Sequence, residues 1–374
     1  MSFAPTVLKT DERVLFALRE LYHSYGYAQY KVRKFEEYDL YMQNKNFLPS
    51  RQLLTFTDTN GNLMALKPDV TLSIIKNTRD TDNMKKVYYT EHVYRVPRNG
   101  SGFREILQTG LECIGDIDLY AMGEVLMLAV KSLRTISERF LLNLSHIGVI
   151  SGILEAEKLD DAACSGILKA IAAKNTHELQ SICTTVGLSA KACQLLQELV
   201  QIHGPMEEIL PQAETMDLPE NSRQALHELK AVHEILLAFG LRENINLDFS
   251  IVNDMNYYNG LFFRGFVDGL PEGVLAGGQY DNLLAKMGKH AGAIGFAVYL
   301  DQLERFRQEV NPYDVDALIL YDDTADTDTL VRTAKFWTNN GKSVRVQKTK
   351  DRNLTCRQLI QITGREVKIL ETND

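Results

Sequence analysis

Two short segments of this chain place aromatic side chains next to polar ones, as small-ligand sites do. One holds the neighbouring tyrosines Tyr257 and Tyr258, and the other, residues 277–281, reads Gly-Gly-Gln-Tyr-Asp. An aromatic slot with a few convergent polar groups is the ordinary form of a pocket for a small organic ligand. Taken alone, a tyrosine pair in a strand is more often explained by packing. The prediction of a ligand site therefore depends on the two segments together and not on any single residue.

An antiparallel sheet flanked by helices is predicted to hold these segments. Alternating apolar residues indicate strands, and apolar residues at helical spacing indicate helices. An Asn-Gly pair between two alternating runs predicts a hairpin over 53–66. The other expected strands are 27–41, 87–93, 107–114, 146–150, 246–251, 261–267 and 274–277, and the expected helices are 11–26, one that begins at 72, 120–142 and 293–309.

Two regions differ in character from this core. The Ala-, Leu-, Lys- and Glu-rich stretch 152–242 predicts an all-helical insert. After a linker at Asn311 and Pro312, alternating strands and helices predict a small parallel sheet. Its expected elements are strands 315–321, 344–347 and 366–370 and helices 327–339 and 354–362. The expected fold class is α+β, with a core over 1–310 and a small C-terminal α/β module over 314–374.

The composition limits the classes of partner and site. The chain has 374 residues and a formal net charge of -8, and an acidic chain argues against tRNA, whose binding depends on neutralising phosphates. No apolar run approaches the ~18 residues that span a bilayer, and the N-terminus lacks the features of a signal peptide. The 5 cysteines and 8 histidines show no metal-ligand spacing. We therefore expect no membrane association, no metal and no disulfide, as in a reducing cytoplasm.

Several motifs together resemble the class II aminoacyl-tRNA synthetase core, and within it the histidyl-tRNA synthetase family. Residues 35–39 correspond to the end of the first class motif, with Arg33 at the position of the family's usual proline. Gln279 stands where the family usually has arginine. The second motif is matched by 94–112, the histidine-specific segments by 252–260 and 277–281, and the third motif by 295–303. The resemblance covers roughly residues 5–310, and the helical insert only loosely.

This resemblance implies a site for the backbone groups of histidine. By position in the family pattern, Asp69, Thr71 and Gln108 are the expected acceptors for the α-ammonium group. Arg95 is expected to bind the carboxylate. Arg104 is a possible anion-binding residue, for the carboxylate, a nucleotide or an inorganic anion. For both arginines the alternative is a structural role, in which they stabilise the sheet through nearby carboxylates.

The same resemblance implies a slot for the imidazole ring. An imidazole needs an apolar slot and a polar partner at each ring nitrogen. Glu112 with Tyr257 or Tyr258 could supply these partners, and Tyr280 could wall the slot.

Two amides stand where the family pattern has arginines that serve amino-acid activation. Adenylate formation builds negative charge on the α-phosphate of ATP and depends on cations to stabilise it. This chain has Asn253 and Gln302 at two of those positions. An amide neither neutralises a phosphate nor offers a charged bidentate fork. We therefore expect histidine binding without activation, and no catalytic residue.

This profile is similar to that of a paralogous family, the regulatory subunits of ATP phosphoribosyltransferase, which catalyses the first step of histidine biosynthesis. The resemblance implies a cytoplasmic hetero-octamer with the short catalytic subunit, feedback inhibition by L-histidine, a homodimer of this chain, and no cofactor. The C-terminal module resembles a shortened anticodon-binding domain, either a remnant or an assembly surface. Two alternatives remain, a divergent histidyl-tRNA synthetase and a histidine-binding module of another pathway.

Overall fold

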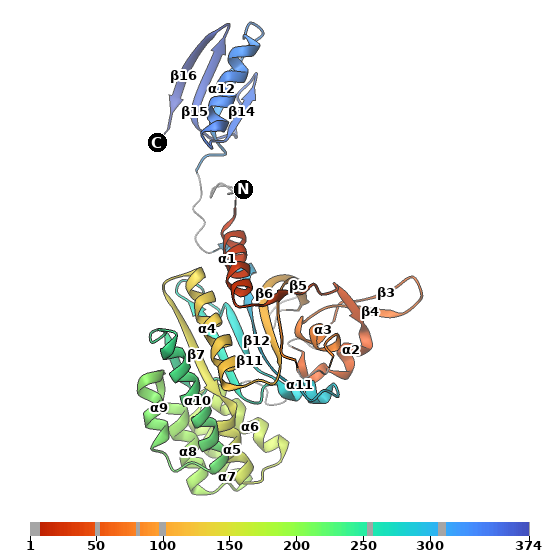
Figure 1. The fold of residues 1–374 in the computed structure, drawn as a ribbon, viewed down its shortest axis with the longest axis vertical. Coiled ribbons are helices and arrows are strands. Elements are labelled where there is room, and N and C mark those ends of the chain that lie inside the picture. Colours follow the sequence, from red (N-terminus) through yellow and green to blue (C-terminus); the bar gives the residue numbers. More distant parts are fainter. Residues whose placement is uncertain are drawn as a thin grey trace. The chain divides into compact units, whose positions relative to one another are not determined.

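The computed structural model describes residues 8–48, 53–79, 83–96, 102–252, 257–305 and 312–373 (Figure 1). Its contacts divide the chain into two units, Thr10–Phe306 and a second that extends to Asp374. The larger unit holds a nine-stranded sheet with the order β1-β5-β6-β12-β11-β10-β7-β9-β8. These strands are β1 (Ala28–Gln29), β5 (Lys85–Arg95), β6 (Arg104–Gly115), β7 (Phe140–His146), β8 (His203–Pro205), β9 (Ile245–Asp248), β10 (Leu261–Val267), β11 (Leu275–Gln279) and β12 (Gly292–Tyr299).

Long antiparallel strands form the centre of this sheet. β5 pairs with β6, and β12, β11, β10 and β7 follow, each antiparallel to its neighbour. β1 and β9 add parallel pairs with β5 and β7. Because successive side chains of a strand point to opposite faces, each central strand contributes to two different cores.

Helix α4 (Leu119–Ile136) supports one face of the sheet. Its N-terminus is capped by Asp118, whose carboxylate accepts the backbone N–H of Ala121 at 2.8 Å. Most of its residues are buried, and it contacts β10 and β12 of the sheet and the helices α1 (Thr10–Ser24) and α10 (Glu220–Ala238). The largest apolar cluster lies here and includes Leu111 and Phe296.

The opposite face is covered by a smaller apolar cluster and a second, three-stranded sheet. This sheet has the order β2-β4-β3, formed by β2 (Phe35–Glu37), β3 (Thr55–Thr57) and β4 (Leu63–Leu66). The expected Asn-Gly hairpin joins β3 to β4, and the Asp58 carboxylate accepts the N–H groups of Asn60 and Asn62 at 2.8 Å each. Short helical segments complete this side: α2 (Tyr38–Gln43), η1 (Lys45–Phe47), α3 (Thr71–Lys76) and α11 (Asp281–Lys286).

The predicted insert over 152–242 is mainly a helix bundle, but the expectation that it is all-helical is wrong, because residues 203–205 within it form β8 and pair with β9 of the sheet. Besides α10 it contains α5 (Ile147–Ala156), α6 (Asp161–Ala172), α7 (Thr176–Val186), α8 (Ala190–Gln201) and α9 (Met206–Glu214). His146 links the parts, because its Nδ1 accepts the N–H of Gly148 and its Nε2 lies 3.1 Å from Glu228 on α10. At Gly152 of α5, a Cβ would lie only 2.6 Å from the backbone nitrogen of Ser222 on α10. The glycine thus allows these two helices to cross closely.

The C-terminal unit is a four-stranded sheet with one helix. Its strand order is β14-β13-β15-β16, and β16 runs antiparallel to β15 while the other pairs are parallel. The elements are β13 (Val315–Tyr321), α12 (Thr327–Asn339), β14 (Val344–Gln347), β15 (Cys356–Thr363) and β16 (Glu366–Thr372). The expected helix over 354–362 is therefore wrong, and the sheet is mixed rather than parallel.

The other errors of local prediction also concern apolar runs. Residues 292–299 form β12 instead of the start of a helix, and the strand expected at 146–150 is wrong because α5 begins at Ile147. A strand buried on both faces has no alternation that distinguishes it from a buried helix. Residues 27–41 form two short strands and the start of α2 rather than one strand. Asn311 of the expected linker lies outside the described residues.

We predict that Gly152→Ala destabilises the protein, because the new methyl group would clash with α10. Overpacking of this kind costs about 1–3 kcal/mol. The matched control is Gly166→Ala on α6, where the nearest atom to a Cβ is 3.8 Å away. That variant should gain about 0.5–1 kcal/mol from helix propensity. Denaturant unfolding of both variants tests this, and equal effects would contradict the tight crossing.

Candidate functional site

The candidate site is organised around a carboxyl group buried in the sheet. Glu112 lies on β6, is 2% exposed, and faces Gly295 of β12 in register. A Cβ at Gly295 would overlap Oε2 of Glu112. The glycine therefore leaves the space in which the carboxyl group lies.

Two hydroxyl groups from different elements donate to Glu112. Thr71 of α3 donates to Oε1 at 2.8 Å, and Tyr280, which precedes α11, donates to Oε2. Burial raises the pKa of Glu112 to about 8, an effect that these two hydrogen bonds reduce and that the charge of Asp69 adds to. Near neutral pH the site therefore holds a largely protonated acid that can share its proton with a ligand.

A second buried acid, Asp69, lies beside the first. Its carboxylate accepts the N–H of Leu72 at 3.0 Å, which fixes the start of α3, and Arg95 lies 3.9 Å from its Oδ2. Burial raises the pKa of Asp69, and the Arg95 guanidinium opposes this. Arg95 also donates through Nε to the carbonyl of Pro68 at 2.6 Å. The Asp69 carboxylate is thus a buried hydrogen-bond acceptor that suits an amine, and Arg95 lies beside it.

A buried ion pair holds the segment that carries Asp69 and Thr71. Lys67 is fully buried, and its Nζ lies 2.6 Å from Oε2 of Glu91 on β5. The other oxygen of Glu91 accepts the backbone N–H of Val32 at 3.0 Å. Glu91 is thus paired with Lys67. The structural alternative for Arg95 is supported through another carboxylate, that of Asp69.

The three predicted tyrosines form one aromatic wall. The ring of Tyr257 lies 4.4 Å from that of Tyr258 and 6.0 Å from that of Tyr280, measured between centroids. The pKa of Tyr257 is raised by burial, and Asp69 and Glu112 add to the effect, while a hydrogen bond with Thr71 lowers it. The tyrosine hydroxyls and the two acids therefore belong to one site.

Gln108 is buried on the same strand as Glu112, whereas Arg104 is exposed at the end of that strand. Gln108 is 2% exposed on the same face of β6 as Glu112, and its Oε1 has no hydrogen-bond partner among the described residues. A buried acceptor of this kind is costly unless a donor reaches it. Arg104 is exposed at the start of β6, opposite Arg95 across the ladder, and within the described part of the chain no hydrogen bond or ion pair holds its side chain.

Of the two amides that replace expected arginines, the structure describes one. Gln302, in the 3-10 helix Leu300–Arg305, donates to the carbonyl of Gly273 at 3.4 Å. Asn253 lies outside the described residues.

Sequence reasoning missed residues that build the site without touching a ligand. Phe47 packs on Tyr257 with ring centroids 5.9 Å apart, and nothing in the sequence signalled it. Gly295 lies in the segment that matches the third motif and Asp281 in a histidine-specific segment, but the sequence pattern gives neither residue a role. Their effect depends on pairing across strands, which the sequence alone does not provide.

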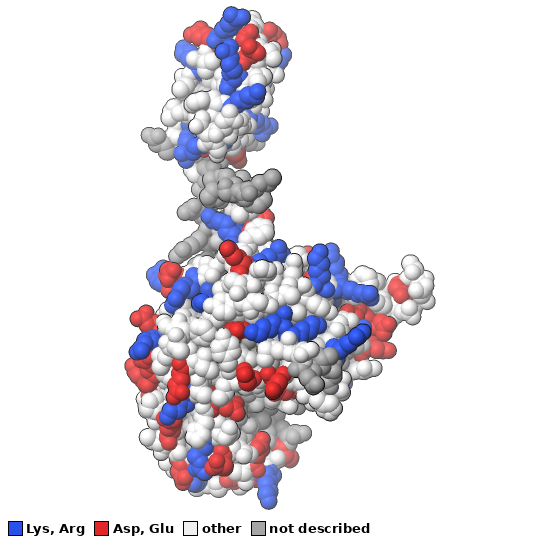
Figure 2. Space-filling model, in the orientation of Figure 1, with Lys and Arg blue, Asp and Glu red and all other residues white. Residues whose placement is uncertain are grey.

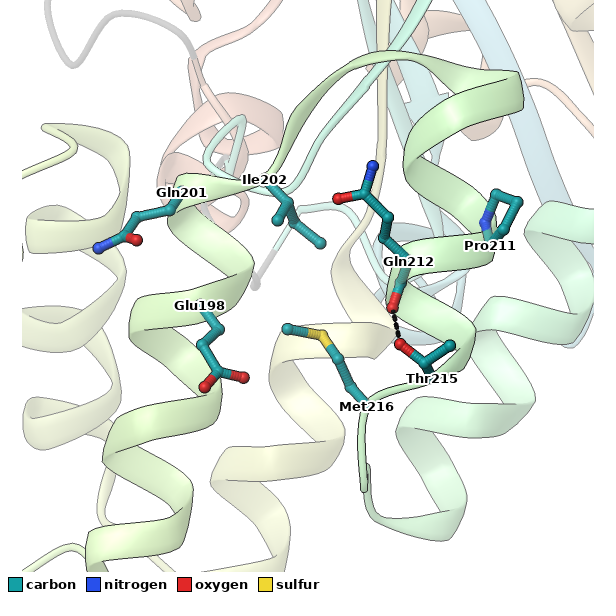
Figure 3. Close-up of a pocket in the computed structure, with 7 residues that line it drawn as sticks. All are labelled: Glu198, Gln201, Ile202, Pro211, Gln212, Thr215 and Met216. Atoms are coloured by element: carbon teal, nitrogen blue, oxygen red, sulfur yellow. Dashed lines mark hydrogen bonds between the residues drawn. The ribbon is translucent and has the colours of Figure 1, made fainter.

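Two features are absent among the described residues, and a further hollow is present. Among the described residues, no group of three His, Cys, Asp or Glu side chains is placed to hold a metal ion. Within the same residues, no helix combines the length and apolar character that crossing a bilayer requires. A separate hollow lies in the insert, beside α8 and α9 (Figure 3). Its lining residues are Glu198, Gln201, Ile202, Pro211, Gln212, Thr215 and Met216.

Comparisons with known proteins agree with this geometry. The family model described as histidyl-tRNA synthetase matches residues 2–303. An ATP phosphoribosyltransferase regulatory subunit from Clostridium kluyveri is 31% identical over 292 residues, which cover 76% of this chain and 74% of that protein.

Solved structures share the fold. One, described as an ATP phosphoribosyltransferase regulatory subunit/histidyl-tRNA synthetase from Bacillus halodurans, gives a TM-score of 0.77 at 23% identity, over 97% of this chain and 96% of that one. A chain of an ATP phosphoribosyl transferase complex from Thermotoga maritima gives 0.61 at 21% identity, over 78% of this chain and 97% of that one.

We predict that Glu112→Gln flattens the pH dependence of stability. The folded protein retains a proton on Glu112 up to about pH 8, whereas the unfolded chain loses it near pH 4.5. The free energy of unfolding of the wild type should therefore fall as pH rises through this window, and the variant should lack this loss. Urea unfolding between about pH 5 and pH 9 measures it, with the exposed Glu138→Gln as control. Parallel curves for wild type and Glu112→Gln would contradict the burial argument.

Proposed function

The chain belongs to the histidyl-tRNA synthetase family and, within it, to the ATP phosphoribosyltransferase regulatory subunits, and on this premise we propose that it activates a short catalytic subunit and inhibits it when L-histidine binds. The chain itself catalyses no step of this reaction in our proposal. It acts by binding one state of the complex better than another when histidine is present.

One observation carries the proposal: the pocket holds buried acids that suit histidine, while amides stand at two positions where the family pattern has arginines for activation. Glu112, Thr71 and Tyr280 form a polar centre that suits an imidazole, and Asp69 beside it suits an α-ammonium group. Gln302 is hydrogen-bonded to Gly273 and carries no charge. We propose that aminoacylation is absent, because a phosphate in this site would meet too few cations.

Proton sharing supports histidine as the ligand. The free imidazole has a pKa of about 6.5, and Glu112 in this site has one of about 8. At a pH between these two pKa values, Glu112 and the imidazole together hold one proton, which either group can carry. At lower pH the imidazole is also protonated, and at higher pH neither group carries the proton. We therefore expect histidine to bind most tightly inside the window.

The expected partners follow from the family and from surface charge. One solved relative is a chain of an ATP phosphoribosyl transferase complex, which supports a catalytic partner, and we propose a hetero-octamer with four subunits of each kind. The formal net charge of -8 gives little electrostatic attraction for tRNA, although Lys and Arg side chains gather on the upper part of the larger unit in Figure 2. The 5 cysteines form no disulfide within the described residues, which supports a cytoplasmic location.

An apolar face of the three-stranded sheet supports a homodimer. Phe35 is 45% exposed, and its ring packs edge-on against Phe56 at 5.3 Å. Met64 and Leu66 are their cross-strand partners and lie on the same face. Phe56, Met64 and Leu66 are half-buried. An exposed ring surrounded by half-buried apolar side chains is typical of a surface that another chain covers.

Reconstitution with the short catalytic subunit of the same organism tests the function. We expect this chain to stimulate phosphoribosyl-ATP formation and histidine to reverse the stimulation. Glu112→Ala or Tyr257→Ala should raise the histidine concentration for half inhibition by about tenfold or more, with stimulation largely kept, because both side chains line the proposed pocket. Equal loss of both effects would show that these residues are structural. Histidine-dependent exchange of pyrophosphate into ATP would indicate a synthetase instead.

The homodimer is tested by Phe35→Glu. A charge in the centre of the patch should dissociate the dimer, because burying an unpaired carboxylate is costly. The control is Phe336→Glu in the C-terminal unit, where an equally large ring is 65% exposed. Light scattering should give a monomer mass for the first variant and a dimer mass for the second. A dimer from both variants would place the interface elsewhere.

A further inference from the structure

A ring of hydrogen bonds surrounds Tyr280 and involves three residues with no assigned role. Asp281 accepts from Ala293 N at 2.7 Å through Oδ1, and from Nε2 of Gln279 at 2.9 Å and Nδ2 of Asn259 at 3.0 Å through Oδ2. Its own N–H donates to Oδ1 of Asn259 at 2.9 Å. Asp281 thus connects the segment that carries Tyr257 and Tyr258, the segment that carries Tyr280, and β12.

Backbone hydrogen bonds complete this ring. The N–H of Tyr280 donates to the carbonyl of Ala293 on β12 at 2.8 Å, and the N–H of Asn259 donates to the carbonyl of Gln279 at 3.1 Å. Tyr258 directly precedes Asn259, so one aspartate is connected to both halves of the aromatic wall. The close approach of Gly260 to the side chain of Gln279 leaves no room for a Cβ there. The ring is therefore tightly packed as well as hydrogen-bonded.

We propose that Asp281 is a positioning residue for the histidine site, which it shapes through Tyr280 and the segment that carries Tyr257 and Tyr258. This inference rests on the proposed function, because it assigns residues to the same site. Asp281 touches no ligand in this proposal. It holds the Tyr280 hydroxyl on Oε2 of Glu112, and Asn259 and Gln279 assist it from either side.

Asparagine at position 281 should break this ring with little change in size. In either orientation of the amide, its NH2 group would face a donor, either the N–H of Ala293 or the NH2 groups of Gln279 and Asn259. Tyr280 would then lose its fixed position and its hydrogen bond to Glu112. That bond lowers the pKa of Glu112, so its loss should move the titration of this acid to higher pH.

The titratable and polar groups that influence Glu112, or are influenced by it, are Asp69, Thr71, Tyr89, Tyr257, Tyr258 and Tyr280. Of these, Asp69, Thr71 and Tyr89 should stay in place in this variant. Asp69 and Thr71 lie at the start of α3 and Tyr89 on β5, all outside the ring. A shift of the Glu112 titration in the variant would therefore report on the tyrosines that Asp281 holds.

Calorimetric titration of the full chain with L-histidine, over a range of pH, tests the proposal. In the wild type, affinity should decline above about pH 8, where Glu112 loses its proton. Asp281→Asn should bind roughly tenfold more weakly at neutral pH, and its decline should begin at higher pH. The matched control is Asp248→Asn, a buried aspartate that accepts from Ser250 and Lys174. It should keep the wild-type affinity and profile.

The outcomes separate this inference from the proposed function. If Asp281→Asn binds as the wild type does, or binds more weakly with an unshifted profile, Asp281 is only structural and the inference is wrong. If the variant does not fold, Asn259→Ala removes two bonds of the ring and must show a weaker effect in the same direction. No binding by the wild type would overturn the proposed function, and this inference with it.

Discussion

The structure of this site depends on one constraint: a carboxyl group placed inside a sheet must have its hydrogen bonds satisfied by groups that come from elsewhere. The carboxyl group of Glu112 accepts hydrogen bonds from hydroxyl groups in α3 and in the loop before α11, two elements that lie far apart in the sequence. Each donor needs its own support. Thr71 is fixed through the segment anchored by Lys67 and Glu91, and Tyr280 through the ring around Asp281. The acid therefore joins parts of the fold that share no strand pairing.

The same constraint explains why binding and activation can separate. The groups that satisfy Glu112 are neutral hydroxyls, and the neighbouring Asp69 is balanced by Arg95 alone. Such a pocket stabilises an amine and a ring that shares a proton, but it offers little to a triphosphate. In the proposed function, the amides Asn253 and Gln302 remove cations that serve activation, while this polar centre remains.

Sequence patterns predicted the elements with clear periodicity and failed where burial removes it. The strand 261–267, the hairpin over 53–66 and the helix 327–339 were predicted correctly, because alternation, turn residues or helical spacing were visible in each. Residues 292–299 were misassigned because β12 is covered on both sides and shows no alternation. The residues of the candidate site likewise fall into those that the sequence could predict and those that it could not. Side-chain chemistry was visible at Glu112 and Tyr280, but the supports at Asp281 and Phe47 depend on contacts across the fold.

Gly295 also limits how this site can change over evolutionary time. Because any side chain there would occupy the space of the Glu112 carboxyl group, the two positions cannot vary independently. A lineage that first lost the acid could accept a larger residue at 295, and restoring the acid would then require two substitutions at once. Gly295 thus makes the loss of the site easier than its recovery. Ligand recognition is easily lost through either position, and it is regained only while the glycine persists.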